Sequence, residues 1–163
     1  MNSTSERNSL PAEDAGEDNA SLILEDFLPY RLNRLSDAVS RKFARTYRLR
    51  HRLTRPEWRV FATLGQYGRM TATAIGAHSA MHKTMVSRAV AALEKRRWLS
   101  HAADPDDRRV EHLMLTKAGR AAYREMVPVA KDFEVRLLSR MGETALARIL
   151  EDLTALEDAV DIS

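Results

Sequence analysis

Apolar residues along this chain recur with helical spacing over most of its length and with strand-like spacing in one short stretch. The first helix is expected over residues 27–47, where an apolar residue returns after every three or four positions and so falls on one face. The members of this stripe are Leu28, Leu32, Leu35, Val39, Phe43 and Tyr47. The pattern predicts a long amphipathic helix near the start of the chain.

A second helix is expected to open at Thr54. There the sequence TRPE supplies a capping hydroxyl, a proline in the first turn and a glutamate at the third position. The helix should end within residues 65–68, which hold two glycines. Its buried face is expected to carry Trp58, Phe61 and Leu64.

Two further helices are expected around a turn at residues 79–81. The first is short, is capped by Thr71 and carries Ile75, and the second covers residues 83–96. In the second helix, three apolar residues at spacings of four and three are expected to face inward: Val86, Val90 and Leu93. The residues left on its outer side are Lys83, Thr84, Ser87, Arg88 and Ala91.

Strand-like stretches at residues 98–102 and 110–115 flank the strongly turn-forming sequence DPDD, residues 104–107. Two helices around a turn, followed by two strands around a turn with paired arginines, resemble a winged helix-turn-helix. In that arrangement one element enters a major groove while the other reaches a neighbouring minor groove.

A fifth helix is expected to begin after Thr116, which can cap it, and Pro128 is expected to kink or break it because an internal proline costs about 3 kcal/mol. Its apolar residues are Ala122, Met126, Phe133, Leu137 and Met141. The last helix is expected over residues 143–160 with a stripe suited to helix pairing, made by Leu146, Ile149, Leu150, Leu153, Leu156 and Val160. The long terminal helices carry more apolar surface than a small core covers, which predicts a two-fold homodimer.

Composition narrows the classes of protein that this chain can belong to. With 163 residues, we expect one folded unit per subunit. The chain has no cysteine, which excludes disulfides, thiolate metal sites and thiol redox sensing. Residues 1–20 hold five acidic residues and one arginine, a charge of −4. Because the net charge of the whole chain is +3, the remaining residues carry +7. This basic remainder favours a polyanionic partner.

The first 20 residues are expected to form a disordered acidic tail, since little in them can be buried. They lack the apolar run of a signal peptide, and no stretch of 18 apolar residues suggests a membrane span. A cytoplasmic location without membrane contact is expected.

The chain resembles the MarR family of transcriptional regulators from about residue 24 to residue 160. Two motifs carry the resemblance: MVSRAVAALEKR with the helix before it, and DPDDRR, followed seven residues after Arg109 by the threonine of LMLTKAGR. It implies a mainly α fold with a small β-wing, in one MarR-type domain over residues 21–163. Within that domain, residues 54–116 would form the winged helix-turn-helix DNA-binding domain, and residues 24–50 and 117–161 the dimerisation helices.

Three positions depart from the family pattern. His82 stands where Ser or Asp usually begins the reading helix, and is a weaker cap and a candidate DNA contact. Arg97 replaces the glycine that commonly follows this helix, so it is expected to take a left-handed conformation. Ser100 and His101 stand where basic residues often begin the strand, which argues against phosphate contacts there.

The predicted partner is double-stranded DNA, whose roughly one phosphate per 1.7 Å requires several cations among short polar groups. The outer side of the reading helix meets this need with His82, Lys83, Thr84, Ser87 and Arg88. On the wing, Arg109 is expected to enter the minor groove, oriented by Asp107, while Arg108 meets phosphate. The alternatives are a solvated helix surface and a solvated turn with internal ion pairs. The cations at residues 95–97 are expected to serve the helix end rather than DNA.

A dimer would present two reading helices about 34–36 Å apart and match a roughly palindromic operator. The expected function is a sequence-specific repressor that overlaps a promoter. Ligand control is implied by the resemblance, through a cleft between the dimerising helices and the reading head. The apolar candidates for this cleft are Tyr30, Leu35, Val39, Phe43, Trp58 and Phe61, for which ordinary core packing is the alternative.

Residues 41–59 contain eight cations and one acid, which predicts contact with the DNA backbone or with an anionic effector. Arg45, Arg48 and Arg50 are the candidates for holding an aromatic carboxylate or an acyl-coenzyme A thioester. The segment over residues 28–61 resembles MarR members tied to aromatic-acid catabolism, including those that answer to hydroxycinnamoyl-CoA thioesters.

An enzyme is not expected. The five histidines are scattered, HSAMH lacks the glutamate of a zinc-protease helix, and no glycine-rich phosphate loop or nucleophile elbow is present. The sequence therefore predicts no catalytic residue, no cofactor and no metal site. The alternative function is an effector-independent architectural DNA-binding protein, which would bind random DNA nearly as well as an operator.

Overall fold

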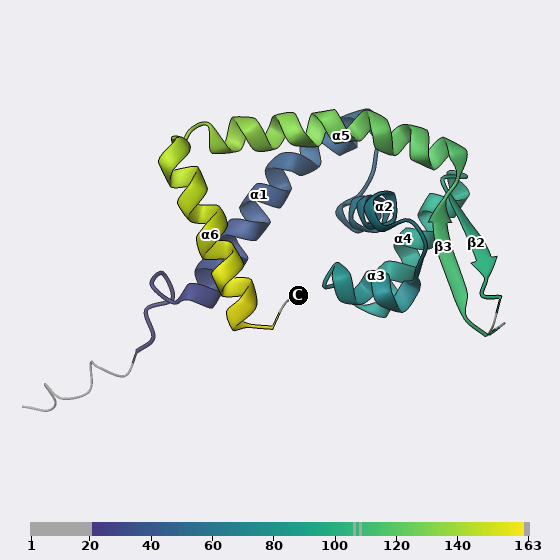
Figure 1. The fold of residues 1–163 in the computed structure, drawn as a ribbon, viewed down its shortest axis with the longest axis horizontal. Helices are drawn as coiled ribbons and strands as arrows, with labels where there is room; N and C mark the ends of the chain where they lie inside the picture. Colours follow the sequence, from purple (N-terminus) through teal and green to yellow (C-terminus); the bar gives the residue numbers. More distant parts are fainter. Residues whose placement is uncertain (1–20, 106, 108, 162–163) are drawn as a thin grey trace, which may run out of the picture. The chain divides into compact units, whose positions relative to one another are not determined.

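The computed structural model describes residues 21–105, 107 and 109–161, and its helices and short strands are shown in Figure 1. The described elements are α1 (Leu28–His51), α2 (Arg55–Tyr67), β1 (Met70–Thr71), α3 (Ala72–His78), α4 (Lys83–Lys95), β2 (Leu99–Ala103), β3 (Glu111–Leu115), α5 (Lys117–Leu138) and α6 (Glu143–Ala159). The predicted fold class, mainly α with a small β-wing, is confirmed. The tail predicted for residues 1–20 and the phosphate contact predicted for Arg108 lie outside the described residues.

The chain divides into two structural units with the boundary between Ala38 and Val39, inside α1. In the first unit, a turn at residues 24–26 precedes the predicted first helix, which is present. The apolar side chains of this unit are largely exposed: Leu22, Ile23, Leu24, Phe27, Leu28, Tyr30, Leu32 and Leu35. The apolar stripe of α1 is therefore uncovered over its first turns, whereas Tyr47 in the second unit is buried.

The second unit contains a three-stranded antiparallel sheet in the order β1-β3-β2. Strands β2 and β3 pair from Leu99 opposite Leu115 to Ala103 opposite Glu111, and with their turn they form the wing, residues 99–115 (Figure 1). Each wing strand begins one residue after its predicted start. Strand β1 was missed, because two residues cannot display the period of two that identifies a strand.

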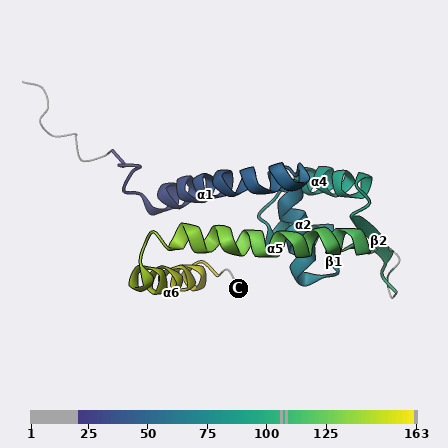
Figure 2. The ribbon, with the colours of Figure 1, turned by 90° about the horizontal axis from the view of Figure 1, so that it is seen from above.

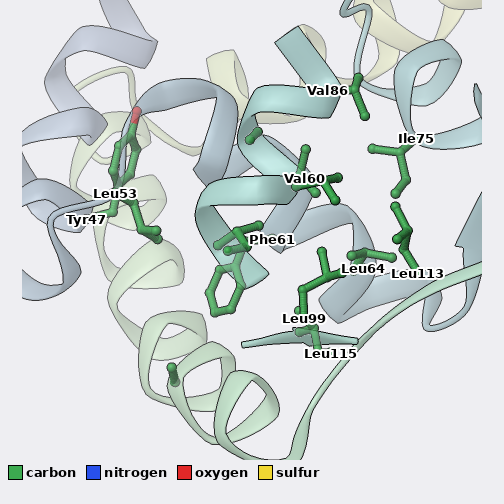
Figure 3. Close-up of a cluster of buried hydrophobic side chains, with 14 of the residues drawn as sticks. Tyr47, Leu53, Val60, Phe61, Leu64, Ile75, Val86, Leu99, Leu113 and Leu115 are labelled. Carbon is green, nitrogen blue, oxygen red and sulfur yellow. The ribbon is translucent and has the colours of Figure 1, made fainter. Parts of the chain in front are cut away.

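The core of the second unit gathers apolar side chains from α2, α3, α4, the sheet and the first half of α5 (Figure 3). Phe61 and Leu64 are buried as expected, while Trp58 is partly buried and packs against this core. Burying one such side chain contributes about 1.5–3 kcal/mol. Trp58 of α2 contacts two aromatic rings of α1. It meets Phe43 edge-on at 5.2 Å between ring centres and stacks on Tyr47 at 5.4 Å, and these contacts join the end of α1 to α2.

Three of the helices begin with the threonine caps that the sequence predicts. The Thr54 hydroxyl accepts the Glu57 N–H while the Glu57 carboxylate accepts the Thr54 N–H, which completes a capping box for α2. Thr71 and Thr116 accept N–H groups of the first turns of α3 and α5 in the same way. At α4, the N-cap residue His82 makes no side-chain cap bond.

The end of α4 confirms the left-handed conformation expected of Arg97, whose φ is +59°. The Arg97 N–H bonds to the Glu94 carbonyl and the Trp98 N–H to the Leu93 carbonyl at 3.0 Å. This is the pattern of a Schellman motif, which satisfies two carbonyls at the helix end. The turn aims the chain directly into β2.

Of the kink or break expected at Pro128, the break does not occur. Helix α5 runs without interruption from Lys117 to Leu138, and Figure 2 shows it as one continuous ribbon. A proline at this position leaves the Arg124 carbonyl without its helical donor. Both Pro128 and Arg124 are exposed, so water can satisfy that carbonyl. Met141, which was assigned to this helix, lies beyond its end.

The last helix, α6, has no buried residue. Its predicted stripe is present, but Leu150 and Leu153 are 54% and 42% exposed, and Val160 follows the last helical residue. Among the residues described, no helix is both long and apolar enough to cross a membrane.

Candidate nucleic-acid interface

The outer side of α4 presents polar and cationic side chains to solvent. Val86, Ala89, Val90 and Leu93 are buried, which fixes the rotation of the helix about its axis. The opposite side exposes the residues predicted to touch DNA: His82, Lys83, Thr84, Ser87 and Arg88. These side chains share one exposed face because they alternate with the buried positions at helical spacing.

The turn that aims α4 is held by several hydrogen bonds. Ser79 accepts the Arg59 guanidinium at its carbonyl, at 3.1 Å, and donates its hydroxyl to the Ile75 carbonyl. The Met81 N–H donates to the Gly76 carbonyl at 2.9 Å. Arg59, one of the eight cations of residues 41–59, therefore supports the turn between the two helices.

At the tip of the wing, Asp107 and Arg109 form a charge-assisted pair. The Asp107 carboxylate accepts the backbone N–H of Arg109 at 3.0 Å, its Nε–H at 3.1 Å and an Nη2–H at 3.4 Å. The backbone bond and then the side-chain bond from Arg109 lower the pKa of Asp107 below its ordinary value. The Arg109 side chain is 92% exposed, so the pair restrains the guanidinium while leaving it open to a partner.

A second cluster, where the wing strands meet their turn, was not predicted. The Asp104 carboxylate meets His112 Nε2 at 2.7 Å and accepts the Asp107 N–H at 3.2 Å. Arg69 donates to the Ala103 carbonyl at 3.2 Å and lies 4.0 Å from Asp104. This cluster ties both wing strands to the residue that precedes β1.

His101 on β2 connects the wing to α4. One of its ring nitrogens contacts the Glu94 carboxylate of α4, and the other lies 2.7 Å from the Glu111 carboxylate of β3. His101 and Glu111 share a face of the wing, because Glu111 pairs with the residue two positions after His101. A register for the predicted strands would have revealed this neighbour, whereas Glu94 is brought there only by the packing of α4.

Within the cation run at the end of α4, Arg96 supports the structure. Arg96 donates to the carbonyls of His51, at 2.8 Å, and Arg52, at 2.9 Å. It also lies 3.7 Å from Glu57 and over the ring of Trp98. Arg96 therefore holds the end of α1 and the start of α2 against α4.

A hollow of about 560 Å³ lies between α3, α4 and the wing. Its walls are mostly apolar, with Met81, Val86 and Leu113 among them, and Lys83 and His101 also line it. The hollow therefore adjoins the outer side of α4.

Comparison with solved structures places this geometry in a known class. A MarR family transcriptional regulator from Silicibacter pomeroyi DSS-3 is 32% identical, with a TM-score of 0.75 over 86% of this chain and 99% of that one. The chain belongs to the MarR family. The MarR family model matches residues 53–110, which extend from the residue before the α2 cap to the wing. The matched family and these structures are transcriptional regulators rather than enzymes.

Two other solved structures are similar to this chain over most of their length. A probable transcriptional regulator from Pseudomonas aeruginosa is 26% identical, with a TM-score of 0.69 over 82% of this chain and 98% of that one. Bordetella bronchiseptica BpsR, whose DNA binding is regulated by 6-hydroxynicotinic acid, shares the fold at 24% identity and a TM-score of 0.70, over 82% and 95% of the two chains. Comparison with curated proteins gives no match.

The MarR chain holds the predicted effector residues in different settings. Tyr30 and Leu35 belong to the first unit and are exposed. In the second unit, Phe61 is buried, and Phe43 and Trp58 pack against the core, as in the alternative of ordinary core packing. Val39 is half-buried, and the cationic candidates Arg45, Arg48 and Arg50 are exposed.

His51 and His78 of this MarR chain also have local partners. The ring of His78 lies 4.5 Å from that of Tyr67, and His51 packs edge-on against Trp98. Burial is the main cause that lowers the pKa of His51, against the opposing charge of Glu125. Within the described part of the chain, no three His, Asp or Glu residues gather in a way that would hold a metal ion.

Proposed function

We propose that this MarR regulator is a homodimeric repressor that reads a roughly palindromic operator and is released by a small anionic effector. In this proposal residues 54–116 bind DNA, and residues 24–50 and 117–161 pair the subunits. The observation that carries it is the combination, in one structural unit, of an exposed cationic face on α4 and an exposed arginine restrained by a carboxylate on the wing.

The outer side of α4 has the chemistry that a major groove requires. Arg88 can form a bidentate pair with guanine, and Lys83 can neutralise a phosphate. Thr84 and Ser87 can bond to phosphate or adapt to either base. His82, at the start of the helix, is a further contact because helix N-termini lie close to the DNA backbone in such complexes.

The wing supplies the second contact. Arg109 is proposed to enter the minor groove, where a narrow groove concentrates negative potential. Asp107 orients it, since a guanidinium already held by a carboxylate loses less rotational freedom when it binds. Arg108 is proposed to meet phosphate.

The wing contact is tested by Arg109→Ala in a mobility-shift titration with an operator selected from genomic fragments. Loss of one specific arginine contact is expected to cost about 1–3 kcal/mol, which is roughly 5- to 150-fold in affinity. Lys95→Ala is the matched control, because it removes an exposed cation that the proposal places neither at the DNA nor in the dimer surface. Equal affinity of Arg109→Ala and wild type, with fold and dimer intact, would remove the wing from the interface.

The proposed effector is an aromatic acid or its coenzyme A thioester. The exposed Arg45, Arg48 and Arg50 offer cations for a carboxylate or for phosphates. BpsR, which shares the fold, is regulated by an aromatic acid. A ligand that binds better to a DNA-incompetent conformation must weaken operator binding by linkage.

Calorimetric titration with p-coumaroyl-CoA and with free aromatic acids tests the effector. Binding heat together with operator release is expected, and Arg48→Ala should weaken both. If Arg48→Ala and Arg45→Ala bind the effector normally, the ligand lies elsewhere, for example in the hollow beside α4. Absence of both heat and release for all of these compounds contradicts the proposed effector class.

The competing function is an architectural DNA-binding protein without an effector. Competition of labelled operator with random DNA at moderate salt separates the two, because a specific regulator typically prefers its site by about 10³-fold or more. Repression itself predicts less transcript from an operator-bearing promoter when the protein is added in vitro, and more transcript would indicate an activator.

A further inference from the structure

His101 lies between two carboxylates that belong to different elements. Its Nε2 faces Glu94 of α4, and its Nδ1 lies 2.7 Å from the Glu111 Oε1 of β3. The two carboxylates therefore approach opposite sides of one imidazole ring. His101 is in consequence a direct polar link between the reading helix and the wing.

Only one charge state of the ring satisfies both contacts. A neutral imidazole has one N–H and one lone pair, so it donates to one carboxylate and opposes the other with its lone pair. An imidazolium has two N–H groups and donates to both. The positions of Glu94 and Glu111 thus fit a protonated His101.

The charged surroundings of the ring favour the same state. From α4, Glu94 faces the ring and Lys83 lines the same hollow, and from β3 Glu111 faces it. His112, which belongs to the cluster with Asp104 and Arg69, lies on the other face of the wing, because successive strand residues point to opposite faces. Burial opposes the charge, but hydrogen bonds and charges from Glu111 and Glu94 outweigh it and raise the pKa of His101 above its ordinary value of 6.5.

We propose that His101 is a positioning residue that, while protonated, holds the wing against α4 and so sets the spacing between the α4 face and Arg109. The proposal rests on the proposed use of α4 and the wing on DNA. A loosened wing adopts more orientations, and binding must then order it at a cost in affinity. Operator affinity therefore depends on pH through a residue that does not itself need to touch DNA.

The direction of the effect follows from the direction of the pKa shift. A raised pKa means that protonation and wing docking stabilise each other. The contribution of His101 to wing docking is fully present below pH 6.5, the ordinary pKa of a histidine. It is lost as the pH rises through the higher pKa that His101 has in the docked wing. Tighter docking and tighter operator binding are expected in mildly acidic solution than at pH 8.5.

The protonation state is tested first without DNA, by imidazole ¹⁵N resonances of the full chain. At pH 6 both nitrogens of His101 are expected to carry protons, and the midpoint should lie above 6.5. Glu94→Gln and Glu111→Gln should each lower that midpoint, because each removes one acceptor charge. A His101 ring that is neutral at pH 6 would overturn the proposal.

The positioning role is tested by operator affinity between pH 5.5 and 8.5. All proteins carry His82→Gln, so protonation of a histidine at the DNA does not contribute. With intact His101, affinity is expected to fall roughly three- to tenfold from pH 6 to 8.5, since one unit of pKa difference between docked and loose wings is a factor of ten. His101→Gln should show little slope and should match the His101 protein at pH 8.5.

The outcomes separate this inference from the proposed DNA contacts. A purely structural role of His101 would lower affinity equally at every pH, which contradicts the proposal. An unchanged pH slope in His101→Gln also contradicts it. If no operator is bound at any pH while His101 titrates as expected, the DNA contacts fail and the link between the elements stands.

Discussion

Arg96 stands in a run of three cations, Lys95 to Arg97, that looks uniform in the sequence. Its guanidinium nonetheless donates to two carbonyls at the end of α1, lies near Glu57 and covers the Trp98 ring. A planar group with several donors can reach all of these partners at once. This one side chain, at the end of α4, thus joins α4 to both α1 and α2.

Replacement of Arg96 by alanine is predicted to destabilise the fold by about 1–3 kcal/mol, because two carbonyls lose a charged donor. Arg96→Lys should recover only part of this, since one ammonium cannot replace the planar fork at both carbonyls. Urea unfolding at neutral pH measures the change. Lys95→Ala, at the exposed neighbouring position, is the control and should change stability little. Equal effects of the two alanine variants would contradict the role assigned to Arg96.

The predictability of the site depends on how far apart in sequence its parts lie. The pairing of Asp107 with Arg109 spans two residues in one turn and follows from composition. Arg69 and Ala103 are separated by 34 positions, and only the pairing of β1 with β3 brings them together. From the sequence, His101 indicated only that a phosphate contact is absent from this strand. Its contact with Glu94 could not be predicted, because the packing of α4 brings the two residues together.

At the scale of elements, α4 begins differently from its neighbours. Thr54, Thr71 and Thr116 each accept a backbone N–H at the start of their helices, whereas His82 does not. An N-cap without a side-chain acceptor leaves a donor to water. The departure of His82 from the family pattern therefore leaves α4 with a weaker start, on the face proposed for DNA.

His82→Ser is predicted to stabilise the protein by about 0.5–1 kcal/mol, because the serine hydroxyl can accept an N–H of the first turn. Thr71→Ala is the opposite control and should cost about 1 kcal/mol. Thermal and urea unfolding measure both changes. The operator affinity of His82→Ser then separates a role of His82 in capping from a role in DNA contact. A loss of affinity in a more stable protein would identify His82 as a DNA contact. No gain in stability would show that the missing cap bond costs nothing.

Two helical glycines mark close approaches of different kinds. A Cβ on Gly119 would lie 2.2 Å from the Trp98 carbonyl oxygen, which is backbone at the entry to β2. A Cβ on Gly65 would meet the Tyr123 ring at 2.4 Å, and a side chain can rotate away. The start of α5 therefore packs against the chain between α4 and the wing at a distance that only glycine permits.

Gly119→Ala is predicted to destabilise the fold by about 1–3 kcal/mol, because backbone must move to relieve the overlap. Gly65→Ala should cost less, since its neighbour is a side chain and alanine gains about 1 kcal/mol of helix propensity over glycine. Urea unfolding of both variants gives the comparison. A larger loss for Gly65→Ala than for Gly119→Ala would contradict this account of the packing.

The helices were predictable because most have a periodic apolar stripe and three of them, α2, α3 and α5, begin with a threonine cap. The failures have local causes. Strand β1 is too short to show a period, and Pro128 lies on the exposed side of α5, where water replaces the lost backbone bond. Arg97 was correctly expected in the left-handed region, because the Schellman motif requires that conformation whatever residue occupies the position.

At the scale of the whole molecule, apolar surface remains uncovered toward both ends of the described part of the chain. In the first unit seven large aliphatic and aromatic side chains around the start of α1 are at least 38% exposed: Leu22, Ile23, Leu24, Phe27, Leu28, Leu32 and Leu35. On α6, Leu150 and Leu153 lie on one stripe and are also exposed. Exposed apolar patches of this kind mark interaction surfaces. A two-fold dimer covers equivalent patches on both subunits at once.

The double substitution Leu150→Lys and Leu153→Lys is predicted to dissociate the proposed homodimer. It should not unfold the subunit core, because α6 contributes no buried residue to that core. Sedimentation velocity should shift from dimer to monomer at micromolar concentration. Operator affinity should fall with it, since a monomer engages one half-site and loses the gain from joined sites. Thr144→Lys with Ala155→Lys is the matched control, because these two exposed, neutral positions of α6 lie off the stripe and each gains the same single charge. If the leucine variant stays dimeric, the subunits pair through another surface. If it becomes monomeric and still binds the full operator with wild-type affinity, pairing is not what fixes the two reading helices on DNA.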